Sequence, residues 1–364
     1  MSTNRAARRL FLSMAAILLA SLLGGCSTDH GTGPTPRART YLMGFTSFPP
    51  KPAPNLALLT IELWSQRGDA ALILSEPPWD SLLAGFPPDS FVRAVHLPLA
   101  NYYRAKGLRL IVSVDPTNGL DRSAESQPLV AAGRSLSEPA VRQAYVNYVT
   151  AMDTILHPDY IGVASETNLI RAIAPASLYN AVVQAASGAA TAVSAEDSTV
   201  KIYTTVQVET AWGKLAGPGG AYVGIDQDLM DFPYIRALGL SSYPYLGGFT
   251  DPDSVPLDYY TRLQLGHSPA LPMLVIEGGW PSDSVGAIPS DPLKQRRYIA
   301  RHALIQDQAS TKAWFQITFT DIDAAAYGFP PGIAPFTQLG LVDVNLSQKP
   351  ALSAWDAVFL RPRR

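Results

Sequence analysis

The fold is decided by the stretch Met273-Leu274-Val275-Ile276-Glu277-Gly278-Gly279-Trp280-Pro281 and by an earlier stretch of the same kind, Ile161-Gly162-Val163-Ala164-Ser165-Glu166-Thr167-Asn168. In each, a short apolar run stops at a glutamate, and glycine or polar residues follow. Such a run is typical of a strand that is buried on both faces of a parallel sheet. Glu166 and Glu277 are therefore expected at the carboxyl ends of two parallel strands.

Apolar runs of this kind alternate with longer segments of helical periodicity along the chain. Candidate strands are residues 41–45, 71–74, 108–114, 160–164, 201–206, 237–241, 273–276 and 313–318. Helices are expected over residues 139–156 and from starts near Pro88, Ala176, Ser254 and Asp291. A repeated strand and helix order predicts a parallel sheet covered by helices.

The number of candidate strands, eight, favours one α/β architecture, the (β/α)8 TIM barrel, with the two glutamates on the fourth and seventh strands. Active sites of this fold lie at the carboxyl ends of the strands. An open, doubly wound sheet is the alternative. It lacks support because no glycine-rich phosphate loop follows an early strand.

The N-terminus has the features of a secretory signal over residues 1–25. Arginines precede the apolar stretch 10–23, which is shorter than the roughly 20 residues that span a bilayer. The segment ends in Leu-Gly-Gly before Cys26, the only cysteine. This resembles the bacterial lipoprotein box, in which the cysteine is lipidated. The alternative is a free cysteine in a cleaved or retained signal segment. Residues 26–40 are then expected to be a flexible tether, and residues 41–364 a single barrel domain in the cell envelope, anchored by lipid at the outer membrane or cell surface.

Charge and spacing exclude several classes of function. Charged residues make up 16% of the chain, the net charge is −2, and no basic cluster occurs outside the signal segment and the last four residues, so nucleic acid is not an expected partner. The five histidines lack the spacing of metal ligands, and no Gly-x-Ser-x-Gly motif occurs. We therefore expect that the protein needs no cofactor. We also expect it to be a monomer.

Two carboxyl groups at one barrel rim suit the hydrolysis of a glycosidic bond with retention of configuration. One carboxyl protonates the leaving oxygen while the other, about 5 to 5.5 Å away, attacks the anomeric carbon. A single strand-end glutamate is more often an ion-pair partner or a helix cap. The two together, on the expected strands, favour catalysis by Glu166 and Glu277.

Several other side chains are candidates for contact with a sugar. Flat aromatic rings that follow or lie within the predicted strands suit stacking on a pyranose, although buried tryptophans are often only packing residues. The candidates are Trp79, Trp212, Trp280 and Trp314. Asp115 ends the third strand, but an aspartate before a Pro and Gly turn is usually a turn residue.

Three short motifs resemble retaining (β/α)8 glycoside hydrolases of clan A. The segment 277–282, Glu-Gly-Gly-Trp-Pro-Ser, resembles the nucleophile segment of family 17 β-1,3-glucanases and that of family 53 endo-β-1,4-galactanases. The segment 238–245 resembles a strand of family 53, and 161–168 resembles the acid/base strand of the clan. The resemblance implies that Glu166 is the acid/base, Glu277 the nucleophile, and Tyr243 the phenol that hydrogen-bonds the nucleophile.

The chain departs from the clan pattern directly before the acid/base. The clan has an asparagine there that contacts the sugar 2-hydroxyl, and this chain has Ser165, so Asn168 is a candidate substitute. No arginine ends the second strand either. The implied activity is a retaining hydrolase of β-linked polysaccharide, galactanase-like first and β-1,3-glucanase-like second. The alternative is a degenerate barrel that serves as a non-catalytic glycan-binding protein or a structural envelope lipoprotein.

Overall fold

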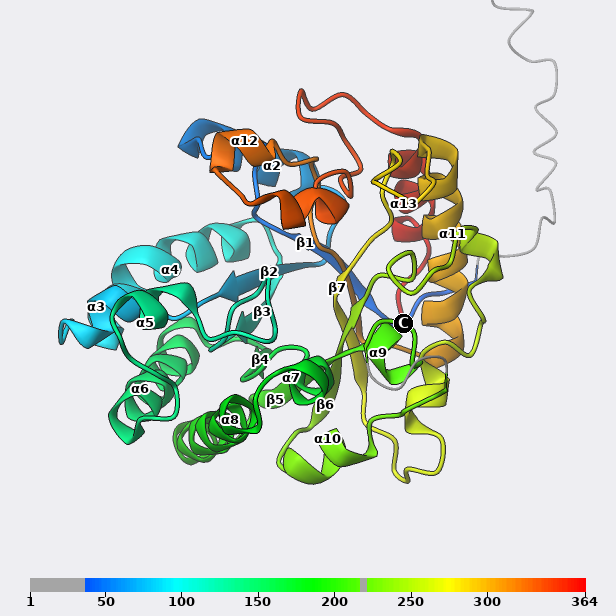
Figure 1. The fold of residues 1–364 in the computed structure, drawn as a ribbon. Coiled ribbons are helices and arrows are strands. Elements are labelled where there is room, and N and C mark those ends of the chain that lie inside the picture. The colour runs from blue at the N-terminus through cyan, green and yellow to red at the C-terminus, as the bar shows by residue number, and fades with distance from the viewer. Residues whose placement is uncertain (1–36, 217–220) are drawn as a thin grey trace, which may run out of the picture. The chain divides into compact units, whose positions relative to one another are not determined.

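Eight parallel strands close into a barrel in chain order, with β8 paired to β1 (Figure 1). The structure is a computed structural model that describes residues 37–216 and 221–364. The strands are β1 (Leu42–Thr46), β2 (Ala70–Ser75), β3 (Arg109–Val114), β4 (Tyr160–Gly162), β5 (Lys201–Gln207), β6 (Ala237–Ser242), β7 (Met273–Gly278) and β8 (Ala313–Gln316). The predicted (β/α)8 barrel is confirmed, and each predicted strand corresponds to an observed one.

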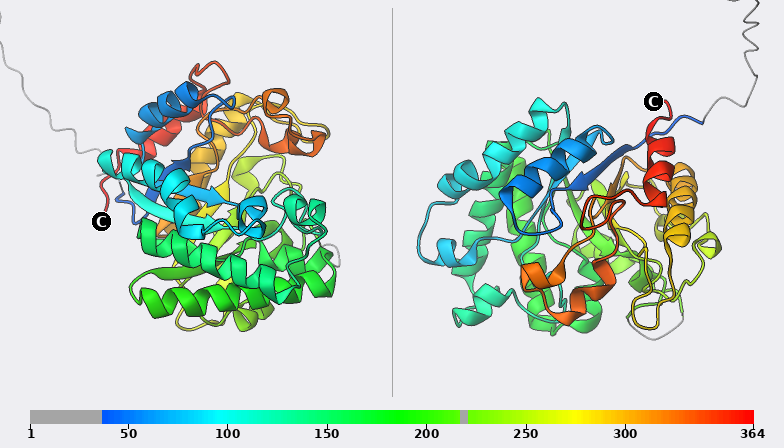
Figure 2. Two further views of the ribbon diagram at one scale, coloured as in Figure 1. Left: turned by 90° about the vertical axis from the view of Figure 1, so that its left-hand side faces the viewer. Right: turned by 90° about the horizontal axis from the view of Figure 1, so that it is seen from above.

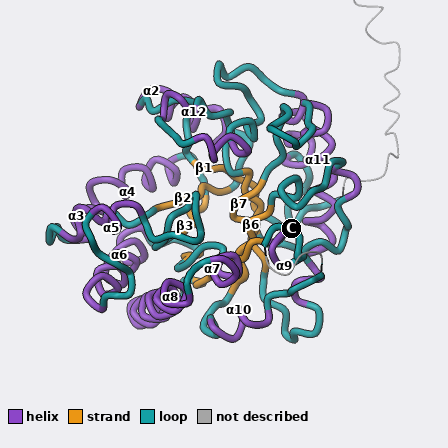
Figure 3. Tube along the Cα trace, in the orientation of Figure 1, coloured by secondary structure: helices purple, strands orange, loops and turns teal. Residues whose placement is uncertain are grey.

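Helices surround the strands, as Figure 3 shows. They are α2 (Pro54–Ser65), α3 (Trp79–Leu83), α4 (Pro88–Ala105), α5 (Gln127–Ala131), α6 (Pro139–Leu156), α7 (Thr167–Ile173), α8 (Ala176–Glu196), α9 (Val208–Ala211), α10 (Asp226–Asp231), α11 (Pro292–Ala309), α12 (Ala324–Tyr327) and α13 (Pro350–Phe359). Helix α6 packs against α4 and α8, and α11 packs against α13 (Figure 2). Helix α6 has the predicted bounds. Helices α4, α8 and α11 begin where expected, whereas α2 was not predicted.

The prediction of a helix that starts near Ser254 is wrong. Only two short 3-10 turns, Pro252–Ser254 and Thr261–Gln264, lie between β6 and β7 in this part of the chain. Pro256 restricts the residue before it, Val255, to an extended conformation. Arg301 of α11 also donates to the carbonyl of Val255, at 2.8 Å from its Nε. That carbonyl is therefore engaged by another element and does not start a helical turn.

Large side chains fill the barrel below its carboxyl rim. Tyr203 of β5 lies inside the barrel and donates a 2.9 Å hydrogen bond to the carbonyl of Val112. The neighbouring strands leave room for its ring by carrying glycine. A Cβ atom at Gly162 would lie 2.7 Å from the Tyr203 ring, and one at Gly239 would lie 2.9 Å from it. The barrel interior is thus a packed core.

The two ends of the barrel unit meet at its amino-terminal face. The backbone N–H of Arg39 donates to Pro362 at 2.8 Å, and that of Arg364 donates to Arg39 at 3.0 Å. These residues precede β1 and follow α13, so they lie opposite the rim that carries the two glutamates. Cys26, the signal segment 1–25 and most of the tether 26–40 lie outside the described residues. Among the residues described, no helix has the length and apolar character that crossing a membrane requires.

Candidate active site

A β-bulge aims Glu277 at the mouth of the barrel. Leu240 of β6 pairs with Val275 of β7, but the next residue, Ser241, pairs with Glu277, so Ile276 is extra. Leu274 and Ile276 both lie in the barrel interior, and regular alternation would turn Glu277 outward. A bulge bends its strand and redirects the side chains after it. Glu277 is partly exposed and accepts a hydrogen bond from the Tyr243 hydroxyl at 3.4 Å.

Glu166 sits in the turn that starts α7. Strand β4 ends at Gly162, four residues earlier than the glutamate. The backbone of Glu166 is left-handed, with φ 47° and ψ 46°, which is uncommon for a residue with a side chain. Its N–H donates to the hydroxyl of Thr205 at 2.7 Å. Such a conformation costs on the order of 1 kcal/mol and is found mainly where the surroundings fix a side chain for function.

Both carboxylate oxygens of Glu166 have donors from other segments of the chain. Ser241 donates to Oε1 at 2.6 Å, and Nε of Arg122 donates to Oε2 at 2.8 Å. Arg122 is only 6% exposed and also forms an ion pair with Asp115. Because one partner is cationic and both are donors, the contacts suit a carboxylate.

Burial and charge act together on the second glutamate. They raise the pKa of Glu277 to about 7, first because its carboxyl is largely removed from solvent and second because Glu166 is negative, while Arg122 opposes the rise. The two carboxyls are therefore close enough that ionising one disfavours ionising the other. Such a pair retains one proton near neutral pH, which acid/base chemistry needs.

A third buried carboxyl stabilises the carboxyl end of β6. Glu209, the second residue of α9, accepts hydrogen bonds from the backbone N–H of Tyr243 at 3.0 Å, from Ser242 at 3.1 Å and from Tyr259 at 3.0 Å. Burial raises the pKa of Glu209 to about 7. These bonds fix the end of β6, and they thereby position the Tyr243 ring beside Glu277.

The structure accounts for three of the remaining polar candidates. Asp115 accepts from the N–H and hydroxyl of Thr117, at 3.0 and 2.8 Å, so it is a turn residue that also reaches the site through Arg122. Ser165 is buried next to Glu166. The role expected for Asn168 is wrong. Its side-chain oxygen accepts from the N–H of Gln207 at 2.7 Å, and its side-chain nitrogen donates to the carbonyl of Gln207 at 2.9 Å. The side chain ties α7 to β5 and is not available to a sugar.

Three of the four tryptophan candidates are packing residues, and the expectation that these three stack on sugar is wrong. Trp79, Trp280 and Trp314 have at most 1% of their surface exposed and belong to the core between barrel and helices. Trp212 is partly exposed, but its ring stacks on Tyr259 at 4.9 Å and lies under the guanidinium of Arg262. Trp79, Trp280 and Trp314 therefore offer no ring face to a ligand, and the sugar contact of Trp212 stays a prediction.

One aromatic side chain missed by sequence reasoning does lie at the site. Phe336, at the end of the 3-10 helix Pro331–Phe336, is partly exposed and packs edge-on against Tyr243, with ring centroids 5.0 Å apart. Arg122 and Ser241 were missed as well. The only sequence signal for Ser241 was its place in the motif 238–245, and Arg122 had none.

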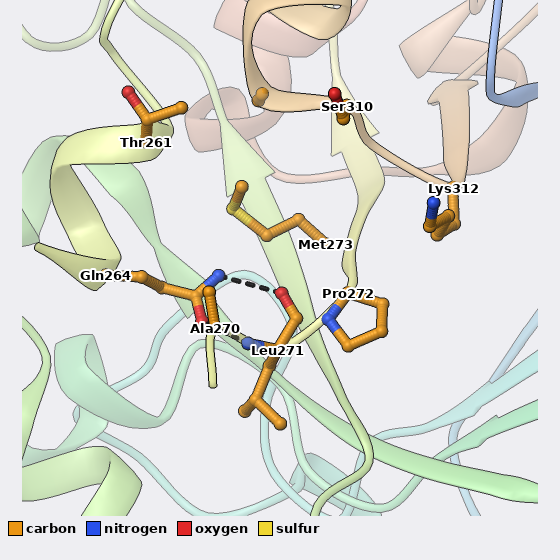
Figure 4. Close-up of a pocket in the computed structure, with 9 residues that line it drawn as sticks. Thr261, Gln264, Ala270, Leu271, Pro272, Met273, Ser310 and Lys312 are labelled. Carbon is orange, nitrogen blue, oxygen red and sulfur yellow. Dashed lines mark hydrogen bonds between the residues drawn. The ribbon is translucent and has the colours of Figure 1, made fainter. Parts of the chain in front are cut away.

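Two cavities lie away from this cluster. One, of about 340 Å³, opens at the amino-terminal ends of β7 and β8, where Gln264 bonds both backbone groups of Leu271 beside Met273 and Lys312 (Figure 4). The other, of about 320 Å³, lies between β1, β2 and α4 and includes His96. Across residues 37–216 and 221–364, no group of three or more His, Cys, Asp or Glu side chains is arranged to hold a metal ion.

Comparison with known proteins shows similarity in fold. No protein-family model matches this sequence, and no curated protein does. Among solved structures, an exo-β-1,4-mannosidase from Opitutaceae bacterium strain TAV5 superimposes with a TM-score of 0.64 and 17% identity, over 88% of this chain. The chain spans 59% of that enzyme's length.

Two further solved structures share the fold, with lower TM-scores. A GH53 catalytic domain from Ignisphaera aggregans matches 72% of this chain and 77% of its own, with a TM-score of 0.54 and 18% identity. A family 39 glycoside hydrolase from Bacteroides cellulosilyticus WH2 matches 89% of this chain and 65% of its own, with a TM-score of 0.58 and 17% identity. At these identities the chain shares the barrel fold of glycoside hydrolases.

Proposed function

We propose that this protein is a retaining glycoside hydrolase that cleaves β-linked polysaccharide. The observation that carries the proposal is the pair Glu166 and Glu277 at the carboxyl rim of a closed barrel, coupled through their charges. The hydroxyl of Tyr243 on Glu277 adds support, since the resemblance in sequence implies that contact. The solved structures of similar fold are named as glycoside hydrolases or as a mannosidase, which agrees with the proposal.

The reaction would proceed by double displacement. The form of the pair that reacts carries its proton on Glu166. In the first step the Glu277 carboxylate attacks the anomeric carbon while Glu166 gives that proton to the glycosidic oxygen, so that the carbon–oxygen bond breaks and a glycosyl ester forms. In the second step Glu166 takes a proton from a water molecule whose oxygen attacks the same carbon, and Glu277 is released. Tyr243 donates its hydrogen bond to the nucleophile whenever Glu277 is ionised.

The choice of polysaccharide rests on the motifs. The segments 238–245 and 277–282 favour an endo-β-1,4-galactanase-like activity, with a β-1,3-glucanase-like activity second. One observation favours the non-catalytic alternative, in which the barrel only binds glycan or is a structural lipoprotein of the cell envelope. Both oxygens of Glu166 are engaged by Ser241 and Arg122, as in a structural ion pair.

A hydrolysis screen separates these two functions. Purified galactan, laminarin, mannan and xylan are incubated with the protein, and new reducing ends are measured. Glu277→Gln serves as the inactive variant, and Glu196→Gln, an exposed glutamate on α8, serves as the matched control. We expect galactan to be cleaved by the wild type and by the control only. Cleavage of none of the four, or equal cleavage by Glu277→Gln, rejects the proposal.

We propose further that Cys26 is lipidated and holds the protein at the bacterial outer membrane or cell surface. The motif before Cys26 supports this. Mass spectrometry of the mature N-terminus tests the anchor. An unmodified N-terminus, or equal release of wild type and Cys26→Ala to the medium, contradicts it.

A further inference from the structure

Arg122 is held in one orientation beside the two glutamates. It lies in the loop between β3 and α5, which is closed by a bridge between Thr117 and Glu125. Its Nη1 bonds the Asp115 carboxylate and the Thr117 hydroxyl, the latter at 3.1 Å, and its Nε bonds Glu166. A planar guanidinium fixed at Nε and Nη1 has no rotational freedom left, so the direction of Nη2 is fixed as well.

The remaining nitrogen of the Arg122 guanidinium, Nη2, is not engaged in this network. No described residue accepts a hydrogen bond from it. Buried side-chain nitrogens without a partner occur elsewhere in the described chain, for example Nε of Arg39 and of Arg171, but Nη2 of Arg122 is not among them. Nη2 is therefore not fully buried, although only 6% of the Arg122 side chain is exposed.

The position of Nη2 relative to Glu166 follows from guanidinium geometry. Nε and Nη2 carry parallel N–H bonds on one edge of the group. Since Nε points at Glu166, Nη2 points to the space directly beside that carboxylate. If Glu166 protonates the glycosidic oxygen, the sugar hydroxyl nearest to it is the one on the ring carbon next to the anomeric carbon. This choice of hydroxyl rests on the proposed function.

The charges around Arg122 decide what kind of sugar fits. Asp115 and Glu166 already pair with this single cation, and Glu277 and Glu76 lie within reach of its charge. A substrate carboxylate would add a further negative charge to this cluster and be repelled. A neutral hydroxyl meets no such repulsion and needs only the unused N–H.

We propose that Arg122 is a substrate-binding residue whose Nη2 donates a hydrogen bond to the 2-hydroxyl of a neutral sugar bound between Glu166 and Glu277. The residue would supply the contact that related enzymes make with the asparagine replaced here by Ser165. A guanidinium at a sugar site suits the carboxylate of a uronic acid where no other carboxylates surround it. Here carboxylates surround Arg122, so we expect a neutral sugar and not a uronic acid.

A comparison of matched substrates tests the contact. Aryl β-galactoside and aryl β-glucoside are each compared with their 2-deoxy analogues, and kcat/KM is measured for wild type and Arg122→Lys. Lysine keeps the positive charge beside Asp115 and Glu166 but lacks the second parallel donor. The matched control is Arg39→Lys, because Arg39 forms a similarly buried pair with Asp69 at the opposite end of the barrel.

The diagnostic quantity is the preference for the 2-hydroxyl substrate over its deoxy analogue. Taking this preference as a ratio between proteins cancels the intrinsic difference in reactivity of the two substrates. A hydrogen bond from a charged donor is worth enough to lower the preference about 10-fold or more in Arg122→Lys, with no change in Arg39→Lys. If both substrates lose the same factor, Arg122 only holds Glu166, and the inference is overturned.

A second measurement does not depend on turnover. The side-chain NMR signals of ¹⁵N-labelled arginine in Glu277→Gln are recorded during titration with galactan and laminarin oligosaccharides, and the Arg122 signal is assigned with the lysine variant. We expect the Arg122 signal to shift and the Arg39 signal to stay. A shift without hydrolysis by the wild type rejects the proposed function but keeps this inference. An unmoved Arg122 signal, whether or not the glycan binds, overturns it.

Discussion

The hydroxyl of Ser241 lies 2.6 Å from Oε1 of Glu166, although 75 residues separate the two in sequence. Ser241 is also the register partner of Glu277 across β6 and β7. Ser241 thus binds the carboxyl of Glu166 directly, and its strand, β6, pairs with the strand that carries Glu277. This relationship explains why the sequence 238–245 matters to the site although it carries neither glutamate.

Removing the Ser241 hydroxyl should impair proton transfer more than folding. In Ser241→Ala, Glu166 loses a hydrogen bond to a charged acceptor, worth about 1.5 to 3 kcal/mol, so kcat/KM on polysaccharide should fall about 10- to 100-fold. Aryl glycosides with good leaving groups need less protonation and should lose less. Steady-state kinetics on both substrate types measure the difference, and equal losses would argue that Ser241 acts only on the fold.

The pH profile should report the raised pKa of Glu277. Below about 7 this carboxyl is protonated and cannot attack, so kcat/KM should fall on the acid side with an apparent pKa near 7. The Tyr243 hydrogen bond lowers that pKa by stabilising the carboxylate. In Tyr243→Phe the acid limb should therefore move to higher pH. A limb that stays in place, or one near 4.5 in the wild type, contradicts the assignment.

Glu209 should make the folded state less stable as the pH rises. Burial raises its pKa from 4.5 to about 7, so between these pH values the folded state binds more protons than the unfolded state, and stability falls with rising pH. The shift corresponds to about 3 kcal/mol. Urea unfolding of wild type and Glu209→Gln at pH 5 and pH 8 should show a smaller pH dependence in the variant. Equal dependence would mean that Glu209 is solvated.

Gly162 should tolerate no side chain. A Cβ atom there would lie 2.7 Å from the Tyr203 ring and 2.9 Å from the Ser113 hydroxyl oxygen, inside the barrel. Overpacking of this kind costs about 1 to 3 kcal/mol, so Gly162→Ala should lower the melting temperature by several degrees. Gly332→Ala is the control, because its Cβ would meet nothing within 4 Å. A Gly162→Ala protein as stable as the control would contradict the packing described here.

The sequence predicts what is local. Apolar runs ending at Glu166 and Glu277 are patterns of a few residues, and they locate the strands and both carboxyls. The outward direction of Trp314 was not predictable, because a strand buried on both faces is apolar at every position. In the barrel its neighbours Ala313 and Phe315 face inward, which turns the indole toward the helices.

The rest of the site depends on contacts between distant segments. Arg122 reaches Glu166 across 44 residues, and its own loop has no motif that points there. The β7 bulge at Ile276 arises from pairing with β6, and without it alternation would place Glu277 on the wrong face. Asn168 illustrates the reverse error, since its position near Glu166 in sequence suggested a sugar contact, while the fold engages it with Gln207.

Covalent trapping identifies the residue that attacks the anomeric carbon. The protein is incubated with activated 2-deoxy-2-fluoro β-galactoside and β-glucoside, which form the glycosyl ester but release it slowly, and the peptides are analysed by mass spectrometry. We expect one sugar bound per molecule, on Glu277, and no adduct in Glu277→Gln. An adduct on Glu166 or another residue, or no adduct in a protein that hydrolyses the parent glycosides, would contradict it.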